Sequence, residues 1–384
     1  MLPAARASCT ILCNRLRVKN RGNRTTTTAV TRAGQGAASH WGRCPSGDGM
    51  DDLTHSHQVP TISQVAEAAG VSRATVSRAF TRPDMLSAAT VRRVLGVAKK
   101  IGYVPNHTAR ALSTGRYGNF ALVVPDVANP FFPPLIRAAQ VEAEKLDFCV
   151  FLGNSDENPG QEEKLVSRFS AQVEGFILAS SRLSDERIRF QAARRPLVLI
   201  NRDVKGIPRV LMDSGTGVGE AVDHLASLGH KRIAYISGPN SSWSNTQRRA
   251  AVRRRARIHA LQVLIVPAQI ASFETGHAAA SAMLDYGATA AVAFDDLMAH
   301  GALAGLAARG VSVPRDFSVV GCDDVLGAMT FPPLSSVTNA CAEAGRVAVS
   351  LLMDMLKTRV VRDARYVLST SLVIRNTTGV AATR

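Results

Sequence analysis

The chain has 384 residues, enough for two or three domains that each bury a substantial core. Its composition, 46% hydrophobic and 20% charged, excludes a chain that is disordered throughout, and no apolar run approaches the roughly 20 residues of a membrane-spanning helix. The 46 Lys and Arg outnumber the 30 Asp and Glu, and the net charge of +16 favours an anionic partner such as nucleic acid. Because the six cysteines form no CxxC pair, we expect reduced thiols in a cytoplasmic protein.

The positive charge is concentrated in the first third of the chain. Residues 60–119 carry nine Lys and Arg against two Asp and Glu, whereas residues 120–384 are nearly balanced. Residues 1–59 combine Arg, Thr, Gly and Ala with little apolar periodicity, so we expect a disordered basic tail. Three explanations of this tail stay open: a transit peptide, a basic arm on DNA, and an assigned start upstream of a true start at Met50.

A helix-turn-helix is predicted to begin the domain formed by residues 60–105. Thr61 stands three residues before Gln64, the spacing of a capping box, and Gly70 supplies the conformational freedom for a sharp turn. Between them the apolar residues recur at helical spacing: Ile62, Val65, Ala66 and Ala69. These features predict a first helix that ends at the turn.

The second predicted helix follows at once, with Ser72 as its N-cap. Val71, Val76 and Ala79 are expected to pack back against the first helix. The outward side chains are then Arg73, Ala74, Ser77 and Arg78.

A third helix is predicted from Ser87 to Gly102, and a short hinge after it. The apolar side chains expected to point inward from the third helix are Val91, Val94, Leu95 and Ala98. Residues 106–118 form the predicted hinge helix and linker. The helix-compatible part, residues 106–113, is too short to be stable alone in water, so it needs a partner to fold.

Residues 61–116 resemble the DNA-binding headpiece and hinge of the lactose-repressor (LacI) family of bacterial transcription regulators. The resemblance rests on TISQVAEAAGVSRATVSR and IGYVPNHTARAL, and it continues over nearly all of residues 61–380. It implies that the helix after Ser72 enters the major groove of an operator. It also implies that the hinge helices of two subunits pair, insert Leu112 into the minor groove and kink the DNA.

The chemistry of the outward side chains agrees with these implied roles. An arginine can contact O6 and N7 of guanine together, and an alanine suits the thymine methyl, so Arg73 and Ala74 are predicted to read bases. Phosphate contacts are expected from Ser72, Thr75 and Asn106. The complete predicted DNA-binding set is Ser72, Arg73, Ala74, Thr75, Ser77, Arg78, Asn106, Arg110 and Leu112.

From residue 119 to 384 short apolar runs alternate with helical patterns, which predicts parallel strands buried on both faces. Because the predicted strands are more than a single sheet usually holds, we expect a doubly wound α/β domain of two lobes with a ligand cleft between them. The predicted strands are residues 120–124, 148–152, 175–179, 197–200, 233–236, 263–266, 290–294 and 317–320.

Motifs for enzyme chemistry are missing, so we expect no enzyme, no cofactor and no metal site. The sequence holds no phosphate-binding GxxxxGK[ST] loop, no GxSxG elbow and no HExxH. The glycines from 215 to 219 are followed by Glu220 where a dinucleotide fingerprint needs glycine, and His55 with His57 fits solvated side chains better than a metal site. The pairs at 295–296 and 323–324 could form a catalytic carboxylate set, but binding of ligand hydroxyls is the simpler explanation.

The carboxy-terminal part is similar to the family's periplasmic-binding-protein-like sensor domain, through PDVANPFF, LASLGHKRIAYISGP, FDDLMAHGAL, VPRDFSVVGCDD and PLSSVT. The resemblance implies a small-molecule effector, a sugar or sugar acid. Aromatic faces suit the apolar side of a sugar ring, and Asp, Asn and Arg suit its hydroxyls. The effector-binding residues implied are Asp126, Asn129, Phe131, Asn201, Ser244, Arg248, Phe273, Asp295 and Asp323.

Two departures from the family pattern keep the effector class open. Ala251, Val252 and Arg253 replace the usual Gly-Phe-Arg run and precede a basic cluster that includes Arg254, Arg255 and Arg257. Asp295 stands where many relatives carry Asn. An uncharged polyol, a cationic ligand and an acidic sugar bound by Arg248 and Arg202 all remain open.

The resemblance implies a homodimer on a pseudopalindromic operator in the bacterial cytoplasm, with effector binding controlling the order of the hinge helices. The chain after the last family motif is too short for a tetramerising heptad segment. The sequence does not decide whether the effector is an inducer or a corepressor, or whether the protein is a repressor or an activator. Two rival classes are a sugar-binding protein or sugar-modifying enzyme with a helical appendage, and an architectural nucleic-acid protein that uses charge alone.

Overall fold

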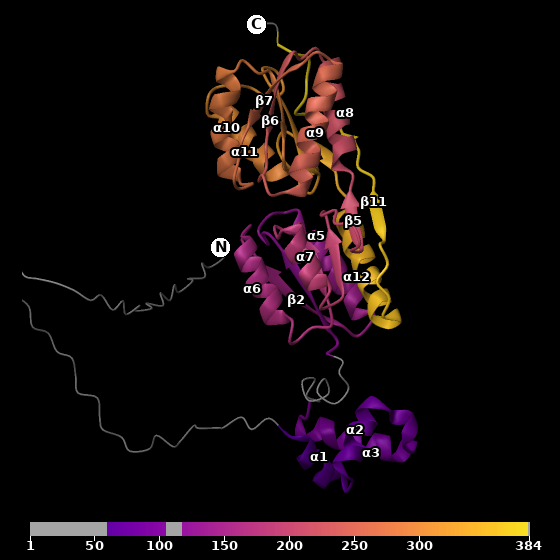
Figure 1. Ribbon diagram of the computed structural model, residues 1–384. Helices are drawn as coiled ribbons and strands as arrows, with labels where there is room; N and C mark the ends of the chain where they lie inside the picture. The colour runs from indigo at the N-terminus through magenta and orange to yellow at the C-terminus, as the bar shows by residue number, and fades with distance from the viewer. Residues whose placement is uncertain (1–59, 105–116, 383–384) are drawn as a thin grey trace, which may run out of the picture. The chain divides into compact units, whose positions relative to one another are not determined.

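Residues 60–104 fold into a small helical domain in the computed structural model, which describes residues 60–104 and 117–382 (Figure 1). The predicted tail at 1–59, with His55 and His57, and the hinge residues 105–116 lie outside the described residues. The elements of the helical domain are α1 (Ile62–Ala69), α2 (Arg73–Thr81), the 3₁₀ helix η1 (Pro83–Met85) and α3 (Ala88–Ile101).

The ends of these helices lie where the sequence predicts them. The Thr61 hydroxyl accepts from the Gln64 backbone N–H at 3.4 Å, and Gln64 Oε1 accepts from the Thr61 N–H at 2.7 Å, which completes the capping box. Gly70 ends α1 with a left-handed φ of 62°, a conformation that glycine adopts without steric cost. Ser72 and Ser87 cap α2 and α3, and Gly102 ends α3.

A compact apolar core joins the three helices, and it leaves out two of the four residues predicted to point inward from α3. Val91 is only half-buried and Leu95 is 39% exposed, because the inward stripe of α3 runs through the other two predicted residues, Val94 and Ala98. Ile101 continues that stripe and packs against the core only partly buried. The fully enclosed residues are Val65, Ala66, Ala69, Val76, Ala79, Val94 and Ala98.

Residues 117–382 form two lobes, as the sequence predicts, and each lobe is built on a six-stranded sheet (Figure 1). The first sheet has the order β11-β5-β4-β3-β1-β2 and the second β12-β10-β9-β8-β6-β7. All strand pairs are parallel except β10 with β12. The amino-terminal lobe begins with β1 (Asn119–Val124), α5 (Phe132–Glu144), β2 (Cys149–Asn154), α6 (Pro159–Phe169), β3 (Phe176–Ala179), α7 (Asp185–Ala192), β4 (Leu197–Ile200) and β5 (Arg209–Met212).

The chain then enters the carboxy-terminal lobe and crosses between the lobes twice more. From β10 it returns to α12 and β11 of the amino-terminal lobe, and it ends with β12 in the second sheet. The elements of this part are α8 (Ser214–Ser227), β6 (Arg232–Ile236), α9 (Trp243–Ile258), β7 (Gln262–Val266), α10 (Phe273–Asp285), β8 (Ala290–Ala293), α11 (Asp296–Ala307), β9 (Ser318–Asp323), η2 (Gly327–Met329), β10 (Ser335–Thr338), α12 (Cys341–Thr358), β11 (Arg365–Leu368) and β12 (Leu372–Val373).

Helices cover both faces of each sheet, which is why the central strands are apolar throughout. In β1 the side chains alternate: Phe120 and Leu122 join the core under α5 and α12, whereas Ala121 and Val123 join the core on the side of α6. In the second sheet one face packs on α10 and α11 and the other on α8 and α9. None of the helices in the described ranges is long and apolar enough to cross a membrane.

The eight predicted strands are present, but the sequence missed β5, β10, β11 and β12. All four are short, and β5, β10 and β11 carry polar residues, as in Arg365 of β11 and the serines of β10. The prediction that every strand is buried on both faces is wrong for β2 and β7. Both are edge strands, and their side chains are largely half-buried or exposed.

Candidate functional site

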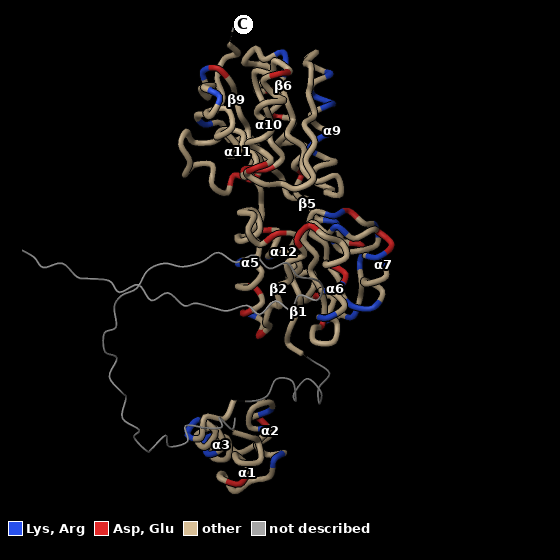
Figure 2. The backbone as a smooth tube through the Cα atoms, turned by 90° about the vertical axis from the view of Figure 1, so that its left-hand side faces the viewer, with Lys and Arg blue, Asp and Glu red and all other residues tan. Residues whose placement is uncertain are grey.

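The exposed face of α2 carries side chains that the sequence assigned to DNA contacts, among them the predicted base readers Arg73 and Ala74. Arg73, Ala74, Ser77 and Arg78 are all exposed, while Val76 and Ala79 face the core. Counted from Arg73, the other three exposed residues follow after one, four and five positions, so all four side chains lie on one side of the helix. Figure 2 shows that Lys and Arg positions recur along α2 and α3 of this domain.

The predicted phosphate contacts at Ser72 and Thr75 have a structural role as well. The Ser72 hydroxyl accepts from the Thr75 backbone N–H at 3.1 Å and lies 2.9 Å from the Thr75 hydroxyl, which fixes the start of α2. The remaining predicted DNA contacts, Asn106, Arg110 and Leu112, lie outside the described residues.

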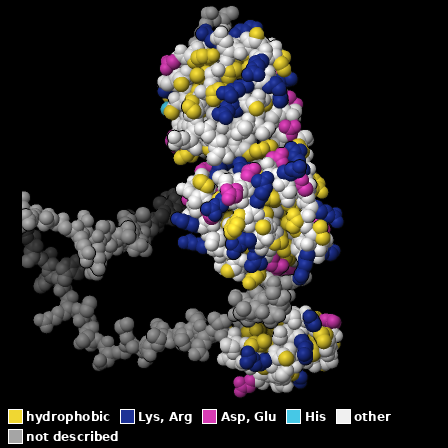
Figure 3. Space-filling model, viewed as in Figure 1, with side chains coloured by type: hydrophobic (Ala, Val, Ile, Leu, Met, Phe, Trp, Pro, Cys, Tyr) yellow, Lys and Arg dark blue, Asp and Glu magenta, His cyan; other side chains and the backbone are white. Residues whose placement is uncertain are grey.

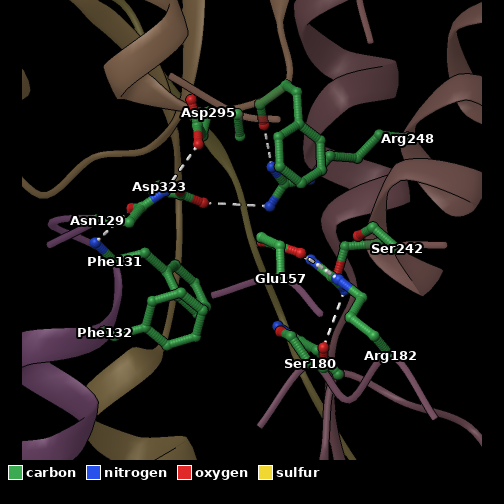
Figure 4. Close-up of a pocket in the computed structure, with 14 residues that line it drawn as sticks. Asn129, Phe131, Phe132, Glu157, Ser180, Arg182, Ser242, Arg248, Asp295 and Asp323 are labelled. Carbon is green, nitrogen blue, oxygen red and sulfur yellow. Dashed lines mark hydrogen bonds and ion pairs between the residues drawn. The ribbon is translucent and has the colours of Figure 1, made fainter. Parts of the chain in front are cut away.

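A cavity with about 400 Å³ of empty space, counting its mouth, lies between the two lobes (Figure 4). Its walls come from the residues that follow the carboxyl ends of parallel strands in both sheets, where open α/β sheets bind ligands. The lining residues are Asn129, Phe131, Phe132, Glu157, Ser180, Arg182, Asn201, Ser242, Ser244, Arg248, Ala271, Phe294, Asp295 and Asp323.

The structure brings seven of the nine predicted effector-binding residues together around this cavity: Asn129, Phe131, Asn201, Ser244, Arg248, Asp295 and Asp323. It places the other two elsewhere. Asp126 closes a local turn by accepting from the Ala128 N–H at 2.9 Å, and Phe273 is the first residue of α10 with 39% of its surface exposed. Arg202 is also outside the lining, because its Nη2 donates to Asp185 at 2.8 Å.

Arg248 is a buried cation in the wall of the cavity. It enters from α9, its Nη2 donates to Asp323 Oδ1 at 3.1 Å, and its Nη1 donates to the carbonyl of Phe294. The guanidinium carbon also lies 4.9 Å from the centre of the Phe294 ring, a cation–π geometry. Its Nε is buried without a hydrogen-bond partner among the described residues, which is rare for a buried donor.

Asn129 and Asp295 connect the two lobes across the cavity. Asn129 Nδ2, from the loop after β1, donates to Asp295 Oδ2 at 3.0 Å, and both residues are buried. Each is also held by its own lobe: Asn129 Oδ1 accepts from the Phe131 N–H at 3.0 Å, and Asp295 Oδ1 caps α11 by accepting from the Met298 N–H at 2.8 Å.

A second arginine, Arg182, is held in the amino-terminal wall by Glu157 and by the carbonyl of Ser180. Arg182 Nη2 lies 3.0 Å from Glu157 Oε1, and Nη1 donates to the Ser180 oxygen at 2.9 Å. Sequence reasoning missed all three residues. Their position directly after β2 and β3 was the available signal, since those strands end at the same edge as β1.

Burial shapes the electrostatics of the cavity. It raises the pKa of both Asp295 and Asp323, although hydrogen bonds and the Arg248 charge act in the opposite direction. Burial alone would lower the pKa of Arg248, but the neighbouring acidic groups, Asp323 among them, raise that pKa above its ordinary value. The guanidinium therefore stays charged at every physiological pH.

This arrangement suits recognition of a small polar molecule with one apolar side. The Phe131 and Phe132 rings meet edge to face at 4.9 Å, and polar groups converge from both lobes. The three carboxylates of the lining all have hydrogen-bond partners in the chain, so none is presented as a free general base. Across the described ranges no three His, Cys, Asp or Glu side chains are grouped as they would be to hold a metal ion.

Comparison with known families gives two separate matches. Residues 61–106 match the family described as bacterial regulatory proteins, lacI family. Residues 222–378 match the periplasmic binding protein-like domain. The first range covers the helical domain and the second most of the carboxy-terminal lobe.

Individual proteins match over most of the chain. The HTH-type transcriptional repressor CytR of Escherichia coli is 32% identical over 332 residues, which cover 83% of this chain and 96% of that protein. The lac repressor dimer bound to operator and the anti-inducer ONPF is 27% identical with a TM-score of 0.76, over 84% of this chain and 100% of that one. The transcriptional regulator CelR in complex with cellobiose is 30% identical with a TM-score of 0.62, over 83% and 99%.

Proposed function

This chain belongs to the lacI family of bacterial regulatory proteins, and it is accordingly a DNA-binding regulator of transcription. From that premise we propose that it is a repressor whose affinity for its operator is controlled by a small effector bound between the two lobes. The observation that carries the proposal is the cavity itself. Both lobes contribute side chains to it, among them Arg248, whose Nε is buried without a hydrogen-bond partner among the described residues.

We assign the DNA contacts to the exposed face of α2 and to the hinge. Arg73 and Ala74 read bases, while Ser77 and Arg78 extend the same face. Ser72 and Thr75 contact phosphates through the start of the helix, as does Asn106 at the start of the hinge. Arg110 and Leu112 act in the minor groove, where Leu112 opens a base step.

The effector we propose is a sugar or a close derivative. Phe131 and Phe132 offer aromatic surface for the apolar side of a ring, and the buried Asn, Asp and Arg side chains suit hydroxyl groups. Cellobiose is the ligand of the similar CelR structure. A neutral sugar fits better than a sugar acid, because Arg182 and Arg248 are each already paired with a carboxylate.

The working unit in this proposal is a homodimer without enzyme activity, located in the cytoplasm where it meets its DNA. The similar lac repressor structure is a dimer on operator. In this chain Phe331 and Met329 are 99% and 76% exposed, which leaves large apolar side chains for a subunit contact. The engaged carboxylates of the cavity support a binding role over a catalytic one.

Control of DNA binding follows from the difference between open and closed lobes. An effector that binds one arrangement better shifts the population toward it, and the shift changes how the paired amino-terminal lobes hold the two hinge helices. An effector that favours frayed hinges acts as an inducer, and one that favours ordered hinges acts as a corepressor.

Fluorescence anisotropy of the full chain tests this function. The probe is a pseudopalindromic duplex from upstream of the chain's own gene, the control is a scrambled duplex, and each is titrated at one fixed salt concentration with a panel of neutral sugars and sugar acids. The proposal predicts operator binding roughly a thousandfold or more above the scrambled duplex, with a shift caused by one ligand. Equal affinity for both duplexes and no response to any ligand would overturn it.

A further inference from the structure

Helix α9 carries a row of arginines on the outer surface of the carboxy-terminal lobe. Arg249, Arg253 and Arg257 recur every four residues, so they lie along one stripe of the helix, and Arg254 stands beside it. Arg253, Arg254 and Arg257 are exposed and Arg249 is half-buried. In Figure 3 the Lys and Arg side chains gather on the lobe over α9. These four residues are called the α9 arginine row below.

The described residues supply no ion-pair partner for the row. No carboxylate in the described ranges lies within salt-bridge distance of any of its four members. The nearest paired arginine, Arg255, shows the contrast: its Nε donates to Asp223 Oδ1 at 2.8 Å, and the same carboxylate accepts from His259 at 2.7 Å. Asp223 is therefore occupied by residues outside the row.

The fold does not require these charges. The face of α9 that packs on the lobe consists of other residues: Ser244, Asn245, Arg248, Ala251, Val252 and Ala256. Like charges four residues apart destabilise a helix. The helix dipole compensates only within the last turn, which includes Arg257 but neither Arg249 nor Arg253. The row is thus locally unfavourable unless an anion binds it.

We propose that the α9 arginine row binds the phosphate backbone of a second DNA duplex, without regard to base sequence. Successive members of the stripe are about 6 Å apart along the helix, so the stripe spans about 12 Å and addresses several charges in a line. Guanidinium groups pair with phosphates through two parallel hydrogen bonds, and all four cations are arginines. A regular linear polyanion therefore matches the row better than a compact anion does, and this chain works in the presence of excess DNA.

Counting duplexes bound per dimer tests the proposal with the full chain. The probe is a 20-base-pair duplex of non-operator sequence in excess, followed by sedimentation velocity at about 50 mM salt. The wild type should bind one additional duplex per subunit beyond those held by its amino-terminal domains. That additional affinity should fall about 40-fold between 50 and 200 mM salt, the dependence expected for three phosphate contacts.

Two triple variants separate the row from net charge. Arg253→Gln, Arg254→Gln and Arg257→Gln together should lose the additional duplexes. Lys357→Gln, Arg359→Gln and Arg362→Gln together remove the same charge from exposed, unpaired positions near the end of α12 and should keep them. Unchanged circular dichroism and an unchanged duplex complex of the amino-terminal domains show that both variants fold.

The proposal is overturned if all three proteins bind the same number of duplexes, or if the α12 control loses them as well. It is also overturned if the duplex is not bound while polyglutamate is bound by the wild type and not by the α9 variant. That outcome would identify the row as a surface for an acidic protein.

Discussion

Asn129 and Asp295, separated by 166 positions in the chain, meet across the two lobes with 3.0 Å between Asn129 Nδ2 and Asp295 Oδ2. The contact lies at the cavity, and both side chains are anchored in their own lobes by backbone hydrogen bonds. The pair therefore links the two lobes directly at the cavity. An effector that takes over either partner changes the balance between open and closed lobes.

Replacing Asn129 with alanine should open the lobes. The substitution removes the donor and leaves Asp295 Oδ2 buried and unsatisfied in the closed form, at a cost of about 1–3 kcal/mol, or a five- to 150-fold change in the closed-to-open ratio. Small-angle X-ray scattering of the ligand-free protein should show a larger radius of gyration. Ser242→Ala, which changes a cavity residue of the carboxy-terminal lobe, should leave the radius unchanged. Identical scattering curves for Asn129→Ala and wild type would show that the hydrogen bond between Asn129 and Asp295 does not hold the lobes together.

The buried pair of Arg248 and Asp323 should respond more to loss of one partner than to loss of both. Each side chain is 6% exposed. Arg248→Met or Asp323→Asn alone leaves an unpaired buried charge and should lower the free energy of unfolding by about 3–5 kcal/mol, whereas the double variant should lose clearly less than the sum. Urea unfolding of all four proteins measures this coupling. Arg315→Met, which breaks the exposed pair with Asp316, is the control and should change little. Additive losses would argue against a coupled pair.

Arg73 should determine operator specificity rather than general DNA affinity. Removing its guanidinium in Arg73→Ala should cost about 1–3 kcal/mol on operator DNA and relax the preference at one base pair, with little effect on a scrambled duplex. Anisotropy titrations against operators with single base changes locate that base pair. Arg93→Ala on α3 removes an equally exposed charge and should leave the base preference intact. An unchanged preference in Arg73→Ala would exclude it as a base reader.

Asp296 should make the carboxy-terminal lobe less stable as the pH rises. Burial raises the pKa of Asp296 to about 7, partly offset by the Ser336 hydroxyl and increased further by Asp295. Because the unfolded carboxyl titrates near pH 4, the folded state binds the extra proton between about pH 4 and 7. Stability from this group is therefore present at low pH and lost as the pH rises through that window.

The variant Asp296→Asn tests this assignment, since asparagine mimics the protonated form. Urea unfolding at pH 5 and pH 8 should show that the wild type loses on the order of 3 kcal/mol more than the variant over that interval. Parallel losses in both proteins would show that Asp296 does not carry the pH dependence.

The sequence sufficed for features that depend on local patterns. Caps and glycines placed α1, α2 and α3, and apolar runs located the central strands of both sheets. Seven cavity residues were found because they follow strand ends or match family motifs. In these cases the information lies within a few neighbouring residues.

Features that depend on contacts between residues far apart in the chain could not be predicted from the sequence. Nothing local links Asn129 to Asp295, or Arg182 to Glu157 at a separation of 25 residues. Phe273 was expected to cover the effector because of its place in the family pattern. The described fold exposes it at the start of α10 and supplies Phe294 as an aromatic wall, held over Arg248.

Thermodynamic linkage tests whether effector binding at the cavity and operator binding are coupled in this protein. The affinity for the effector is measured by titration calorimetry on the free protein and on the protein saturated with operator duplex, and compared with the operator affinity measured with and without effector. Both ratios should equal the same factor, between about 5 and 150, and Asn129→Ala should change them together. An effector that binds equally well to the free and the operator-bound protein would show that the cavity and the operator site are not coupled.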